Sequence, residues 1–147
     1  MSFPPSLLVY FDASVLYGPD NATPVSGAVG IVVEEGTTVE IERSIGVDAV
    51  ASSTELEFRA LAEAATAVDR RFDRVSSVHL HGDAEVVVRA ADPDDDTEPP
   101  TRIARRRVEM ARAALADVPT VTYRAVSRAA NERAHELARE GHGPEDR

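Results

Sequence analysis

The sequence predicts a single α/β domain whose elements follow the order β-β-β-α-β-α-α-β-α. Two observations predict this class. Three strand-like segments open the chain with only turn-rich residues between them, as in an antiparallel meander. Helical and strand-like patterns then alternate to the end of the chain. At 147 residues, the chain is long enough for one domain with one sizeable core.

The first three strands are expected at residues 7–13, 27–35 and 37–45, where β-branched and other apolar residues predominate. The turn-rich stretch YGPDNATPVS separates the first two, and a turn at Glu35-Gly36 separates the last two. Short turn-rich connections join antiparallel neighbours, so we expect a meander.

The next segment, residues 52–72, has the clearest helical pattern in the chain. Ser52 stands three residues before Glu55, which is the spacing of an N-terminal capping box. An apolar stripe at helical spacing consists of Leu61, Ala65, Val68 and Phe72. We expect the helix to turn this stripe toward the sheet.

The rest of the chain alternates strands and helices. The expected elements are a strand at 76–83, a short helix at 84–92, a helix at 102–116, a strand at 120–126 and a helix at 131–140. On the helix at 102–116, the residues expected to face the core are Ala104, Val108, Ala111 and Leu115. Residues 93–100, PDDDTEPP, hold three prolines and predict an acidic loop. The core should span about residues 7–140, followed by a polar tail at 141–147.

The composition is strongly acidic. The chain has 26 acidic and 16 basic residues, for a net charge of -10, and every basic residue is an arginine. Salt screens the self-repulsion of such a surface, which is why it is typical of proteins from salt-accumulating halophiles; the alternative is codon bias in a GC-rich genome. Such a protein would have to bind nucleic acid through local arginines or metal ions, because its net charge repels phosphate.

The chain contains no cysteine, so it has no disulfide, thiolate nucleophile or thiolate metal site. A metal would need oxygen or imidazole ligands, which suit Mg²⁺ or Mn²⁺ better than structural zinc. There is no apolar run near 18 residues and no secretory leader, so no membrane contact is expected. We expect a soluble monomer in the cytoplasm.

Three carboxylates stand in unusual places. Asp12 ends the apolar part of SLLVYFDASVL, Glu57 lies on the core-facing stripe of the first helix, and Asp83 ends the strand at 76–83. Each residue also has a simpler possible role. Asp12 could belong to a turn network with Ser14, Glu57 could interact favourably with the helix dipole, and Asp83 could cap the helix that follows it. If the first and fourth strands pair and the helix crosses them, the three groups converge. Convergent carboxylates repel unless cations neutralise them, as in phosphodiester hydrolysis by two divalent ions.

Five pieces of the chain resemble the type 1 ribonuclease H family, in the family's order: YFDAS, GAVGIVV, SSTELEFRAL, VHLHGDAEVVV and RAANERAHELA. The resemblance implies a ribonuclease H-like fold, with a mixed five-stranded sheet flanked by helices. It also implies a metal-dependent endonuclease that cleaves the RNA strand of RNA/DNA hybrids with two divalent ions. By motif, Asp12, Glu57 and Asp83 match the family's metal-binding carboxylates.

The chain departs from the family at the fourth acidic position, where it has His135. A neutral imidazole still binds divalent metals and suits Mn²⁺ better than Mg²⁺, so His135 is predicted as a fourth catalytic and metal-binding residue. Alternatively, the second ion binds weakly, or His135 is a surface histidine. Asn131 is expected to cap the last helix.

The family's mobile histidine has no match, and Arg128 in that region is expected to contact a phosphate. On the helix after the acidic loop, three arginines share one face and could follow a phosphate backbone; a solvated face is the alternative. The predicted substrate-binding residues are Ser14, Arg102, Arg105, Arg112, Arg128 and Asn131. We expect His142 to be solvated, and His79 and His81 to be packed.

Two other functions remain open. His135 and the missing mobile histidine favour a module of the same fold that binds nucleic acid or protein with weakened catalysis. A nuclease of this fold that acts on single strands or structured DNA is a further alternative.

Overall fold

The computed structural model describes residues 3–20, 23–47 and 52–143. Its elements are β1 (Ser6–Tyr17), β2 (Pro24–Glu35), β3 (Thr38–Val47), α1 (Ser53–Arg71), β4 (Ser77–Gly82), α2 (Glu85–Ala91), α3 (Arg102–Ala114), β5 (Thr120–Ala125), a 3-10 turn (Ala129–Asn131) and α4 (Glu132–Glu140). This order confirms the predicted one, with the 3-10 turn added. No helix within these ranges is long and apolar enough to cross a membrane.

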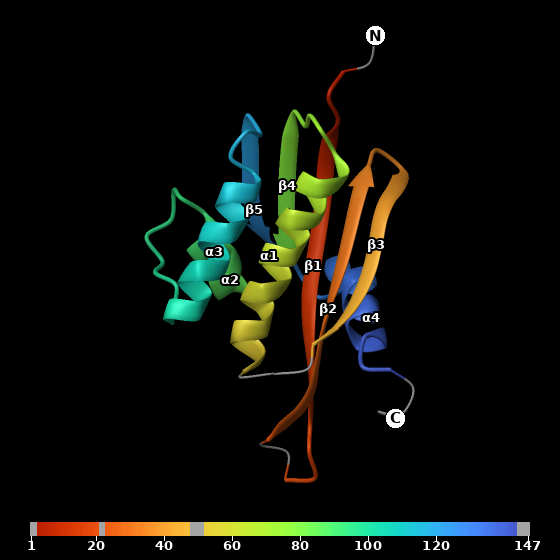
Figure 1. The fold of residues 1–147 in the computed structure, drawn as a ribbon, viewed down its shortest axis with the longest axis vertical. Helices are drawn as coiled ribbons and strands as arrows, with labels where there is room; N and C mark the ends of the chain where they lie inside the picture. Colours follow the sequence, from red (N-terminus) through yellow and green to blue (C-terminus); the bar gives the residue numbers. More distant parts are fainter. Residues whose placement is uncertain (1–2, 21–22, 48–51, 144–147) are drawn as a thin grey trace.

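The five strands form one mixed sheet in the order β3-β2-β1-β4-β5 (Figure 1). β1 pairs antiparallel with β2, and β2 with β3, as the predicted meander requires. β4 joins the other edge of β1 in parallel, and β5 joins β4 in parallel. The predicted mixed five-stranded sheet flanked by helices is therefore confirmed, and the first and fourth strands do lie side by side.

The β1–β2 hairpin is longer than predicted. β1 continues to Tyr17 and β2 begins at Pro24, whereas the sequence pattern placed the strand ends at residues 13 and 27. The register runs from Leu8 opposite Glu34 to Tyr17 opposite Pro24. The pairing therefore continues through residues that by composition resemble a turn, and the hairpin extends past the rest of the sheet (Figure 1).

α1 begins and packs as the sequence predicts. Ser52 is its N-cap, and the Ser52 hydroxyl accepts a hydrogen bond of 3.1 Å from the Glu55 amide. The predicted stripe is buried at Leu61, Ala65 and Val68. The inward residues predicted for α3 are also buried: Ala104, Val108, Ala111 and Leu115. Both helices belong to the main core against one face of the sheet.

The opposite face is covered by α4, which contacts β2, β1 and β3. Side chains on β2 alternate between the two faces, so Ile31 lies in the main core while Val32 packs with Ala134 and Leu137 of α4. Gly30 permits this contact to be close. A Cβ atom at position 30 would lie 2.1 Å from the Ala134 carbonyl oxygen.

The parallel pairing of β1 with β4 stops early, and this opens the edge of the sheet. Its register ends at Tyr10 opposite His81, whereas β1 itself continues to Tyr17. Asp12 lies just past the last pair, and Asp83 directly follows the end of β4 at Gly82. The separation of the two strands therefore leaves space on the β4 side of β1 at Asp12.

Replacing Gly30 with alanine should lower the free energy of unfolding by about 2–3 kcal/mol, because the methyl group must displace α4 backbone. Gly18→Ala is the matched control, since the nearest atom to a Cβ there is 3.4 Å away; it should change stability by less than about 0.5 kcal/mol. Denaturant titration measures both. Equal losses in the two variants would contradict this account of the α4 contact.

Candidate metal centre

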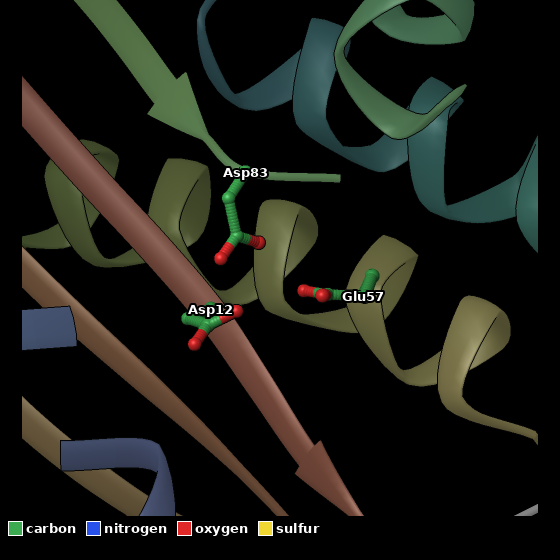
Figure 2. Close-up of side chains that lie close together, drawn as sticks. All are labelled: Asp12, Glu57 and Asp83. Carbon is green, nitrogen blue, oxygen red and sulfur yellow. The ribbon is translucent and has the colours of Figure 1, made fainter. Parts of the chain in front are cut away.

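Three carboxylates from separate elements meet where β1 and β4 part. Asp12, Glu57 and Asp83 each offer an oxygen, and these oxygens all lie within 4.8 Å of one another. Figure 2 shows the three side chains pointing toward one another from β1, from α1 and from the segment that follows β4. The structure thus brings together the three carboxylates that the sequence singles out.

The cluster is largely enclosed by protein. Asp12 is only 1% exposed, while Glu57 and Asp83 are partly buried. Glu57 is flanked along α1 by Leu56 and Phe58, which are both buried in the main core. The cap at Ser52 and the packing of these neighbours therefore fix the rotation of α1 that aims Glu57 at β1.

Burial and mutual repulsion disfavour the charged forms of these groups. Burial, followed by the charges of Asp12 and Asp83, raises the pKa of Glu57 to about 9. Burial also raises the pKa of Asp12, against the opposing effect of a hydrogen bond with His135. Without a counter-cation, the cluster is most stable with a proton on Glu57.

The oxygens of the cluster that accept no hydrogen bond fit a divalent cation. Glu57 Oε1 and Asp83 Oδ2 are buried and lack a hydrogen-bond partner among the described residues. Buried polar atoms without a partner cost about 1–3 kcal/mol each, and a bound cation would satisfy them. A set of carboxylate oxygens is the donor chemistry that Mg²⁺ and Mn²⁺ prefer.

Two further predicted residues, His135 and Arg128, lie beside the three carboxylates. His135 Nδ1 is 2.8 Å from Asp12 Oδ2, and its Nε2 is 3.5 Å from Arg128 Nη1. Arg128 Nε is also 3.8 Å from Asp83 Oδ2. Among the described residues, the group whose ligand atoms all lie within 4.8 Å of one another consists of the carboxylates and does not include His135.

Ser14 and Asn131, both predicted to bind substrate, have partners within the protein. Asn131 is 1% exposed, and its side-chain amide donates to the Phe11 carbonyl oxygen at 2.9 Å. It is the N-cap residue of α4, as predicted, but its side chain makes no cap hydrogen bond. The Ser14 hydroxyl is bonded to His142 Nε2 at 2.9 Å.

Two of the three α3 arginines predicted to bind substrate, Arg105 and Arg112, have partners away from the carboxylates. Arg105 pairs with Glu98 of the acidic loop at 3.1 Å. Arg112 donates to the carbonyl oxygens of Ala90 and Ala91 and so satisfies the end of α2. Arg102 is exposed. Their predicted contact with a phosphate backbone stays a prediction.

Sequence reasoning missed the role of His142. It was expected to be solvated, but it is 8% exposed and bridges Ser14 and Ser26. A lone histidine between two glycines gives no signal for partners more than 100 residues away. The expected packing of the strand histidines is confirmed, since His81 stacks on Tyr10 and His79 is bonded to the Thr122 hydroxyl.

The fold matches solved structures over nearly the whole chain. RNase H1 from the halophilic archaeon Halobacterium salinarum NRC-1 is 29% identical, with a TM-score of 0.75 over 92% of this chain and 96% of that one. The N-terminal RNase H domain of Rv2228c from Mycobacterium tuberculosis is 18% identical, with a TM-score of 0.78 over 93% of both chains. LC11-RNase H1, isolated from compost and solved in complex with an RNA/DNA hybrid, is 20% identical, with a TM-score of 0.73 over 93% of this chain and 96% of that one. No family model and no curated protein matches the sequence.

Replacing Glu57 with glutamine should remove most of the pH dependence of stability in chelator-treated protein. The pKa of Glu57 is raised from 4.5 to about 9, so its stabilising contribution is full below pH 4.5 and is lost as the pH rises through 9. Wild type should therefore lose stability between about pH 5 and pH 9, and Glu57→Gln should lose much less. Denaturant titration across this range measures the effect.

The control is Asp69→Asn, which changes an exposed carboxylate on the same helix and should keep the wild-type profile. Parallel profiles for wild type and Glu57→Gln would contradict the protonated cluster.

Proposed function

We propose that this chain, which belongs to the RNase H-like family, is a metal-dependent endonuclease that hydrolyses the RNA strand of RNA/DNA hybrids. The observation that carries the proposal is the enclosed cluster of Asp12, Glu57 and Asp83 at the point where β1 and β4 part. The hybrid bound by LC11-RNase H1, a protein of the same fold, supports this substrate class.

The proposed cofactor is a pair of divalent ions, either Mg²⁺ or Mn²⁺. These ions would supply Lewis acidity and would lower the pKa of a water molecule that attacks the phosphorus. Asp12, Glu57 and Asp83 would hold them, because these groups carry the convergent oxygens of the cluster. Glu57 would also help to position a 2′-hydroxyl, the group that distinguishes RNA from DNA. No nucleophilic side chain is needed, which suits a chain without cysteine.

Arg128 is the cation best placed for a phosphate of the substrate. Its side chain is 70% exposed and lies beside Asp83. An arginine can donate two parallel hydrogen bonds to phosphate oxygens. The other predicted substrate contacts, including the arginines of α3, stay predictions.

We propose further that the enzyme works at high salt. The excess of acidic residues and the similarity to an RNase H1 from a halophilic archaeon support this proposal. Salt at molar concentration reduces the Debye length to about 3 Å, which limits repulsion between the acidic surface and the hybrid. Its action as a monomer in the cytoplasm stays a prediction.

One observation favours the second candidate function, a binding module with weakened catalysis. His135 replaces the fourth acidic residue of the family motif, and it lies beside the carboxylates instead of among them. A protein that binds a hybrid without cleaving it in any metal would support this candidate.

Asp12→Asn should reduce cleavage of a labelled RNA/DNA hybrid by about 10³-fold or more. The variant should remain folded and gain stability without metal, because one of the repelling charges is lost. The assay uses molar salt with Mg²⁺ and Mn²⁺ in parallel, and its substrates are the hybrid, duplex RNA, duplex DNA and single strands.

Asp69→Asn, which alters an exposed carboxylate of α1, is the matched control and should cleave like wild type. Unchanged cleavage in Asp12→Asn would refute the proposed centre. Preference for a substrate other than the hybrid would refute the substrate class while keeping the nuclease.

A further inference from the structure

His135 is bonded at both of its ring nitrogens. Nδ1 lies 2.8 Å from a carboxylate oxygen of Asp12, and Nε2 lies 3.5 Å from a guanidinium nitrogen of Arg128. The same guanidinium approaches Asp83 Oδ2 at 3.8 Å. Arg128 and His135 thus form a link between two of the three carboxylates, Asp83 and Asp12.

The chemistry of these partners determines where the ring carries its proton. Arginine has only hydrogen-bond donors, so the Nε2 atom that faces Arg128 must be the acceptor. Nδ1 then carries the hydrogen and donates it to Asp12 Oδ2, which accepts. A ring with a hydrogen on Nε2 would instead point that hydrogen at a guanidinium.

We propose that Arg128 holds His135 in the Nδ1–H tautomer and that His135 is a positioning residue that orients Asp12, not a metal ligand. The presence of a metal at this site rests on the proposed function, but the tautomer of His135 and its contact with Asp12 do not.

The arrangement argues against direct coordination of a metal by His135. A nitrogen that carries hydrogen has no lone pair to give, which removes Nδ1. The lone pair of Nε2 faces a permanently charged guanidinium, which would repel a divalent cation there. The carboxylate group within the described ranges also forms a mutually close set without the imidazole.

The contact with His135 gives Asp12 a fixed orientation. One carboxylate oxygen of Asp12 is occupied by the Nδ1 hydrogen bond, which leaves the other for a cation. Hydrogen-bonding partners of this kind orient metal ligands, and their loss weakens metal affinity by about 10- to 100-fold. His135 can therefore support the centre from a position where the family motif has a carboxylate.

The first test is the tautomer itself, read from long-range ¹H–¹⁵N correlation spectra of metal-free protein at an alkaline pH that leaves the ring neutral. We expect the His135 ring, assigned by its absence in His135→Gln, to give the Nδ1–H pattern. In Arg128→Ala the pattern should shift toward a mixture of tautomers, whereas Arg139→Ala, which alters an exposed arginine of α4, should keep it. An Nε2–H ring in wild type would overturn the proposal.

The second test uses Mn²⁺ alone and pulsed electron paramagnetic resonance. Mn²⁺ bound to wild type should show no directly coordinated nitrogen. His135→Ala should bind Mn²⁺ about tenfold more weakly, and His135→Asn, which restores an N–H donor near the Nδ1 position, should recover most of that loss. A coordinated nitrogen that disappears in His135→Gln would overturn the proposal.

The two tests separate this inference from the proposed function. Absence of Mn²⁺ binding in every variant would refute the metal centre, and the tautomer spectra would still decide the role of His135. Mn²⁺ binding with hybrid cleavage but with a coordinated imidazole would support the function and refute the inference.

Discussion

The mutual repulsion of three enclosed carboxylates is the constraint on which the rest of this site depends. Asp12, Glu57 and Asp83 have oxygens within 4.8 Å of one another in a region from which protein excludes much of the water. Such a group is stable only with a bound proton or a bound cation, and the pKa of about 9 for Glu57 reflects this choice. The close approach of these groups therefore lowers the stability of the fold at a pH where all three are charged.

The fold holds these groups together through features that are far apart in the sequence. The parallel pairing of β1 with β4 ends at Tyr10, and beyond it the Asn131 amide donates to Phe11. Asn131 in turn precedes α4, which carries His135 to Asp12 and lies against the sheet at Gly30. The packing of α4 against the sheet therefore determines the position of His135 relative to Asp12. A substitution that shifts α4 should also shift this contact.

Local patterns in the sequence predict the elements well, because the cap at Ser52 and the helical stripes depend only on neighbours. The sequence also singles out Asp12 and Glu57 as candidate site residues, because charged side chains are unusual in apolar stretches. The bridge of His142 to Ser14 and Ser26 could not be predicted, because it depends on how α4 ends against the sheet. The contact of Arg112 with the end of α2 depends likewise on tertiary packing.

The most direct test of the central claim is calorimetric titration of the chelator-treated protein with Mn²⁺ at pH 7 in buffers of different ionisation enthalpy. A cation that replaces the proton on Glu57 should release about one proton for each centre that is filled, and its apparent affinity should rise as the pH approaches 9. Binding without proton release, or binding that Asp12→Asn leaves unchanged, would contradict the account of these carboxylates as a metal centre.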